Sequence, residues 1–95
     1  MAQSEAHIPT DMASRYLGQL CKHFEHKRPV AFSRDHGSIT FDTGVCTLDA
    51  TDTSLILHAD APDAENLEKL QSVVVKHLER FAFRNPVEVT WTAKD

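Results

Sequence analysis

A short run of the chain gathers side chains that bind metal ions. Cys21, His23 and His26 follow one another closely, and thiolate and imidazole are ligands of zinc and iron. On a helix, successive side chains turn by about 100°, so Cys21 and His23 point roughly 160° apart and cannot grip one ion. His23 and His26 are about 60° apart and could share iron or zinc with a third ligand. His36 is the next histidine along the chain, and the alternative is that these are only surface histidines near a helix end.

Basic residues surround this pair of histidines. Lysines and arginines dominate residues 22–36, although the formal net charge of the chain is −4. A basic corner can attract an anionic small molecule or an acidic partner. The alternative is that Lys27 and Arg28 only complement the negative end of a helix. The candidate binding residues are therefore Lys22, His23, His26, Lys27 and Arg28, together with His77 on a second predicted helix.

The two cysteines, Cys21 and Cys46, offer a different chemistry. Cys46 is predicted to point inward from a strand and Cys21 to lean into the core, so the two thiols could be neighbours. They could form a redox pair, or they could be small apolar core residues that the cytoplasm keeps reduced. Cys46 beside His77 or His23 would be the dyad of a thiol enzyme. His77 could equally be a structural histidine that forms a hydrogen bond at the edge of the sheet.

Hydrophobic spacing predicts the elements that position these residues. Apolar side chains recur every three or four positions over residues 10–27, which indicates a helix that stops before Pro29. A second such stripe, starting at Asp60 or Asp63, predicts a helix up to about residue 83. Residues 5–9 are predicted to form a short edge strand. Val73 and Val75 flank the stripe of the second helix, either as a surface for a homodimer or at the core margin.

Alternating residues predict the strands between and after the helices. We expect strands over residues 30–32, 38–42, 45–50, 55–59 and 87–92, with a tight turn at Gly44 where glycine supplies a positive φ. The outward positions are polar and rich in threonine, so one face should meet water. The expected fold is α+β, a two-layer sandwich with element order (β)αβββαβ, in which two helices cover one face of an antiparallel sheet. His58 would lie on the open face, which could bind a ligand or simply be solvated.

Length and composition exclude several classes of protein. A chain of 95 residues has room for one domain, here 1–95, and 41% hydrophobic residues with a small net charge argue against disorder. The acidic balance argues against nucleic-acid binding, and there is no apolar run long enough to span a membrane. The first residues lack the pattern of a signal peptide, which predicts a cytoplasmic protein. No nucleophile elbow, P-loop or dinucleotide motif occurs, so an enzyme is not favoured.

Three blocks of the sequence resemble a known family. The resemblance is to a bacterial family of small domains of unknown function, found alone or joined to siderophore-interacting flavin reductases. Because that family has no assigned activity, the resemblance implies no catalytic residue. The association of the family with siderophore-interacting reductases implies a role in iron acquisition. The resemblance also draws attention to Cys21, His23, His26, Gly44, Cys46 and His77. The blocks are Tyr16-Leu17-x-Gln19-Leu20-Cys21-Lys22-His23-Phe24-x-His26-Lys27, Gly44-x-Cys46-x-Leu48, and residues 77–84 with Val89-x-Trp91.

Three functions remain open from the sequence. The favoured one is a non-enzymatic accessory domain for iron or siderophore handling, in which His23, His26 and the basic residues meet an anionic chelate or an ion. The second is a protein-interaction module that forms a homodimer or docks on a flavin reductase through Val73, Val75 or a free sheet edge. The third is a small thiol-dependent enzyme.

Overall fold

The computed structural model describes residues 2–81 and 89–94, and for residues 81 and 94 it describes the backbone alone. It contains two helices and six strands, and it confirms the predicted α+β class. In chain order the elements are β1 (Ala2–Pro9), α1 (Ala13–Phe24), β2 (Val30–Phe32), β3 (His36–Thr40), β4 (Val45–Ala50), β5 (Ser54–Ala61), α2 (Ala64–Phe81) and β6 (Thr92–Lys94).

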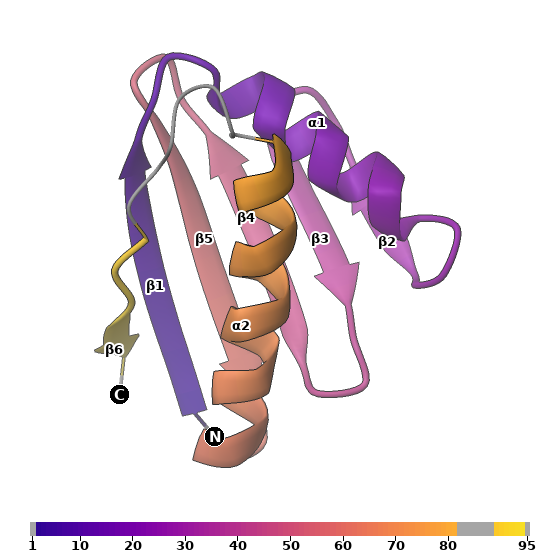
Figure 1. Ribbon diagram of the computed structural model, residues 1–95, viewed down its shortest axis with the longest axis vertical. Helices are drawn as coiled ribbons and strands as arrows, with labels where there is room; N and C mark the ends of the chain where they lie inside the picture. Colours follow the sequence, from indigo (N-terminus) through magenta and orange to yellow (C-terminus); the bar gives the residue numbers. More distant parts are fainter. Residues whose placement is uncertain (1, 82–88, 95) are drawn as a thin grey trace.

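The strands form one antiparallel sheet with the order β2-β3-β4-β5-β1-β6. Both helices lie on the same face of this sheet (Figure 1), so the predicted two-layer arrangement is confirmed. Between the layers the core consists of alternate strand residues and the apolar stripes of both helices. Its largest fully buried side chains are Ile8, Leu17, Leu20, Ile39, Leu48, Leu55, Leu57, Leu70, Val74 and Leu78.

The first helix is shorter at both ends than the predicted 10–27. At its start the hydroxyl of Thr10 accepts a hydrogen bond from the backbone N–H of Met12, one residue before α1 begins. At its end the carbonyl of Phe24 accepts from the N–H groups of Lys27 and Arg28, at 2.9 and 2.8 Å. These tight turns take the chain out of the helix before Pro29, whose ring disfavours helical backbone in the residue ahead of it.

The first strand is longer than predicted, and it is not an edge strand. It spans Ala2–Pro9 and lies between β5 and β6. The inward positions include Ser4, a polar residue that obscures the alternation in the sequence. Its buried hydroxyl is satisfied by the side chain of Gln71 on α2, whose Nε2 donates at 2.5 Å. That bond allows the strand to start earlier than an apolar pattern indicates.

The C-terminal part also differs from the prediction. Residues 89–91 belong to no strand, and the short β6 begins only at Thr92, where it pairs with Glu5 of β1. Val89 and Trp91 nonetheless pack partly against the core, as does Val73, which favours the core-margin interpretation for that residue. The predicted end of the second helix at 82–83 and strand residues 87–88 lie outside the described residues. No helix in the described ranges has both the length and the hydrophobicity needed to cross a membrane.

Candidate functional site

A surface cleft of about 330 Å³ lies where the end of α1, the side of α2 and the turn after β3 meet. Four of the six candidate binding residues identified from the sequence line this cleft. It is therefore the place where tertiary structure concentrates the predicted chemistry. The lining residues are His23, Phe24, Lys27, Arg28, Phe41, Asp42, Thr43, Val73 and His77.

Four rings of the cleft are in contact. Phe24 and Phe41 meet edge to face with centroids 4.9 Å apart, and both are largely buried, at 6% and 9% exposure. The His77 ring lies 4.7 Å from Phe24 and 4.8 Å from His23. His23 also meets Phe24 edge to face at 5.1 Å. Edge-to-face and tilted contacts are the favourable arrangements of aromatic rings, so the rings form a continuous wall.

A hydrogen bond fixes the protonation pattern of His77. Its Nδ1 lies 2.7 Å from the carbonyl oxygen of Val73, one turn earlier on α2. A carbonyl oxygen can only accept, so Nδ1 carries the proton and Nε2 of the neutral ring is an acceptor. The bond lies within α2 itself, whereas the sequence analysis placed the possible hydrogen bond of His77 at the edge of the sheet. Protonation would turn Nε2 into a second donor, which an anion could use.

The surroundings of His23 favour its neutral form. Loss of hydration lowers its pKa from the ordinary 6.5, and so does repulsion from His77 when that ring is protonated, from Lys27, from Arg80 and, last, from His26. Burial and nearby cations both penalise a charged imidazole. His23 is therefore neutral at pH 7 unless a negative charge arrives beside it.

The two permanent cations of the cleft, Arg28 and Lys27, differ in whether a carboxylate pairs with them. Nη1 of Arg28 lies 2.9 Å from Oδ1 of Asp42, a carboxylate that is 88% exposed. A pair this exposed is screened by water and adds little to stability. Within residues 2–81 and 89–94, by contrast, no carboxylate lies within ion-pair distance of Lys27. Lys27 is thus the cation best placed to meet an anionic ligand.

The other two candidates, Lys22 and His26, are exposed and do not line the cleft. His36, suggested as a third metal ligand, instead lies on the open sheet face with its Nδ1 2.7 Å from Oδ1 of Asp49. In the described part of the chain no group of three or more His, Cys, Asp or Glu side chains is arranged to hold a metal ion. An iron or zinc site at His23 and His26 therefore stays a prediction without a described third ligand.

The two cysteines are both fully buried. Burial raises the pKa of Cys21 to about 11, with a further contribution from Glu25. Burial likewise raises the pKa of Cys46 to about 12, and the charge of Cys21 adds to this. A thiol must ionise to act as a nucleophile. Neither cysteine is therefore poised for catalysis at neutral pH.

The open sheet face carries a second polar cluster, of which the sequence analysis singled out only His58. On β1, the carboxylate of Glu5 lies between two imidazoles, with Oε1 2.8 Å from Nε2 of His58 and Oε2 3.1 Å from Nε2 of His7. Glu5 and His58 face each other directly in the sheet register. The signal was present in the sequence as polar residues at alternate positions from Gln3 to His7.

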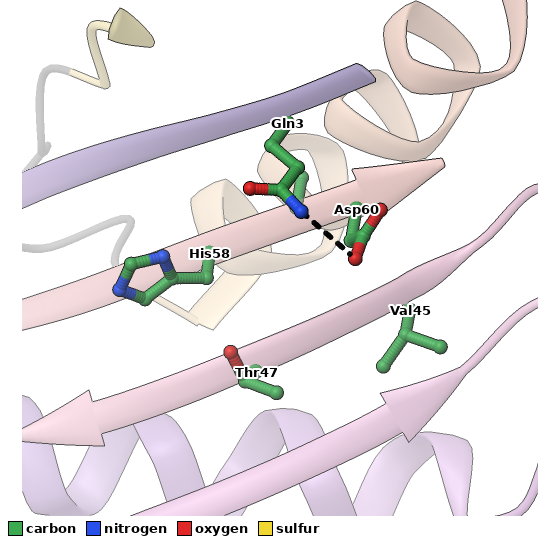
Figure 2. A pocket seen from close by; sticks show the side chains of 6 residues that line it. Gln3, Val45, Thr47, His58 and Asp60 are labelled. Atoms are coloured by element: carbon green, nitrogen blue, oxygen red, sulfur yellow. Dashed lines mark hydrogen bonds between the residues drawn. The ribbon is translucent and has the colours of Figure 1, made fainter. Parts of the chain in front are cut away.

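A depression of about 540 Å³ lies beside this cluster, and Figure 2 shows the side chains that line it. Nε2 of Gln3 donates to Oδ2 of Asp60 at 3.3 Å, and the ring of His58 points away from both of them. Thr47 lies opposite His58 in the register, as the sequence predicted for the exposed face. Because the polar groups here largely pair with one another, the cleft between the helices is the stronger candidate site.

Comparisons with known proteins give a fold and a family without an activity. Residues 5–92 match the model of a family described as an uncharacterized protein conserved in bacteria, DUF2218. The chain is also similar to PA4090 of Pseudomonas aeruginosa, whose structure was solved by NMR. That similarity has 35% sequence identity and a TM-score of 0.82, and covers 97% of this chain and 96% of the other. No curated protein matches the chain.

Proposed function

The chain belongs to the uncharacterized bacterial family DUF2218, and from that premise we propose that it is a non-enzymatic accessory domain that binds an anionic ferric chelate. The ligand would occupy the cleft between α1 and α2. One observation carries this proposal: His23, Lys27, Arg28 and His77 come together on the walls of a single cleft. Convergent donors and cations in a partly apolar hollow are typical of sites for small anions.

An accessory role fits this cleft better than catalysis does. The thiols are buried and their pKa values are raised to about 11 and about 12, so they supply no nucleophile at neutral pH. The groups that line the cleft can hold and orient an anion through charge-assisted hydrogen bonds. We place this role in the cytoplasm, where buried cysteines such as Cys21 and Cys46 stay reduced.

Calorimetric titration of the untagged protein with ferric citrate, an anionic iron chelate, tests the proposal. We expect saturable binding that the Lys27→Ala variant weakens by about tenfold, because a charge-assisted hydrogen bond contributes roughly 1.5 kcal/mol. Lys22→Ala is the matched control, since it removes the same charge close by but outside the cleft. His26→Ala is the control for His23→Ala in the same way.

The controls decide whether the cleft is the site. Equal weakening by Lys27→Ala and Lys22→Ala would mean that only overall charge attracts the chelate, and the proposal would then be wrong. Failure of the wild-type protein to bind ferric citrate or a ferric catecholate would also reject it. Metal bound without a chelate would point instead to the predicted pair of His23 and His26.

A second candidate function is docking through the sheet edge, either in a homodimer or on a flavin reductase. Strand β2 is at the edge of the sheet, and Phe32 on it is 38% exposed, the only large hydrophobic side chain in the described residues with such exposure. An unpaired edge can accept another strand. Sedimentation of the wild-type protein and of Phe32→Ser tests this: a wild-type dimer that the variant dissociates supports it, and a wild-type monomer that binds no reductase rejects it.

A further inference from the structure

We infer that the cleft between α1 and α2 recognises the ring of its ligand as well as its charge, so that its preferred ligands are planar aromatic acids. Benzoates and phenolates are the simplest members of this class. The inference rests on the proposed function and names the ligand class of the same site. It is carried by the juxtaposition of four side-chain rings with Lys27 and Arg28 in one hollow.

The wall formed by the four rings offers contacts that an inorganic anion could not make. Phe24 and Phe41 form its buried base, while the half-buried ring of His77 and the exposed ring of His23 extend it toward solvent. An aromatic ligand placed against the two imidazoles gains tilted or edge-to-face contacts, about 0.5–1.5 kcal/mol beyond its buried area. An inorganic anion gains none of this, and an aliphatic acid gains only burial.

The size of the cleft suits a small aromatic molecule. Its volume is about 330 Å³, whereas an apolar cavity of about 150 Å³ is enough to hold benzene. One substituted ring therefore fits with room for its acidic group and for water. A large chelate would place only one of its arms inside.

Charge determines which way such a ligand would lie. Asp42 lines the cleft with its Oδ1 2.9 Å from Nη1 of Arg28, and its negative charge disfavours a second carboxylate beside Arg28. Lys27 lines the same cleft and has no described carboxylate within ion-pair distance, so we expect the acidic group of the ligand to lie toward Lys27. The guanidinium of Arg28 can meanwhile lie over the ligand ring, a contact that contributes about 0.5–1 kcal/mol at exposed sites.

Two probes, one with a planar aromatic ring and one with a saturated ring, test the inference. Benzoate and cyclohexanecarboxylate carry the same single charge and the same number of ring carbons. We would titrate each into labelled protein and follow backbone amide resonances by NMR, which measures millimolar affinities. We expect benzoate to bind at least fivefold more tightly, and to shift the amides of Phe41 and Thr43 through its ring current.

Variants of the wall make the test specific to this site. Phe41→Leu keeps an apolar side chain but removes a ring. It should therefore bring the ratio of the affinities for benzoate and cyclohexanecarboxylate closer to one. The matched control is Phe32→Leu, the same substitution on the exposed edge strand β2, which should keep the preference. Should Phe41→Leu unfold, His23→Gln removes a ring from the exposed part of the wall and should reduce the same preference.

The outcomes separate this inference from the proposed function. Equal affinity for benzoate and cyclohexanecarboxylate would overturn the ring inference, even if ferric citrate binds. A preference for benzoate that Phe32→Leu removes and Phe41→Leu keeps would also overturn it. A preference for benzoate in a protein that binds no ferric chelate would support the ring inference and reject the iron role.

Discussion

The chemistry of this protein is concentrated in a few side chains whose protonation depends on their neighbours. His23 and His77 lie 4.8 Å apart, one on each helix. His77 is held in one tautomer by the carbonyl of Val73, and His23 is kept neutral by lost hydration and by surrounding positive charge. An anion in the cleft would reverse this balance, since a nearby opposite charge favours the charged imidazole. Ligand binding and protonation are therefore expected to be coupled at His23.

Anion binding should become tighter as the pH falls toward and below 6.5. In the free protein the pKa of His23 lies below its ordinary 6.5, and a bound carboxylate raises it, so the complex takes up a proton. Affinity then increases as the pH falls from the bound-state pKa to the free-state pKa and levels off below both. Calorimetry of benzoate binding in buffers with different ionisation enthalpies measures the proton uptake.

Replacing Asp42 should strengthen anion binding. The carboxylate neutralises Arg28 at 2.9 Å and stands at the cleft wall. Asp42→Asn removes one repulsive charge, frees the guanidinium and should tighten benzoate binding by about two- to fivefold, as expected for an exposed charge contributing up to 1 kcal/mol. Asp35→Asn, an equal charge change outside the cleft, is the control. Weaker binding by Asp42→Asn would show that Asp42 itself holds the ligand.

Turns and strand register bring the elements of the cleft together. The β3–β4 turn carries Phe41 and Asp42 to the end of α1, and Gly44 closes that turn with φ +157°. A Cβ at Gly44 would collide with the carbonyl oxygen of Asp60 on β5. Gly18, on α1, meets nothing within 4 Å of an added Cβ. The two glycines therefore differ in what they contribute: Gly44 is required by the turn, and Gly18 is only tolerated by the helix.

Alanine at these two glycines should change stability in opposite directions. Gly18→Ala should raise the free energy of unfolding by about 0.5–1 kcal/mol, because alanine loses less conformational entropy in a helix. Gly44→Ala should lower it by roughly 1–3 kcal/mol through strain and the collision with β5. Urea denaturation of both variants measures the changes. Destabilisation of similar size in both would contradict this account of α1 and the turn.

The sheet has one face that the helices bury and one face that is exposed to solvent. Two helices seal one sheet face, with both thiols inside, while the other face carries paired polar side chains such as Glu5 and His58. The raised pKa values of Cys21 and Cys46 are a property of this sealed layer. Because of them, the free energy of unfolding should change with pH in the alkaline range.

The free energy of unfolding should fall as the pH rises above 9.0. The folded state keeps the protons of Cys21 and Cys46 up to pH values of about 11 and about 12, whereas the unfolded chain releases them from 9.0 upward. Within that window each thiol lowers the free energy of unfolding by about 1.4 kcal/mol per pH unit. Denaturation of wild type and Cys46→Ala across this range gives the slopes. An unchanged slope in the variant would contradict a buried thiol at position 46.

The sequence by itself determined the class of fold and the directions of its side chains. The alternation over residues 45–50 and the two helical stripes, one around Leu17 and Leu20 and the other around Leu70 and Leu78, predicted two helices on one face of an antiparallel sheet, as observed (Figure 1). Helix spacing also turned Cys21 inward and His26 outward, as observed. Such patterns work because periodicity records where a side chain points relative to its own element.

Only the tertiary structure decided which elements face each other. His23 meets His77 because α1 and α2 pack side by side over the sheet, and Phe41 joins them because the β3–β4 turn ends beneath α1. β1 lies inside the sheet because it pairs with both β5 and β6, and its buried Ser4 is satisfied by a hydrogen bond from Gln71 on α2. These contacts join residues distant in sequence, and local periodicity contains no information about the partner across a packed layer.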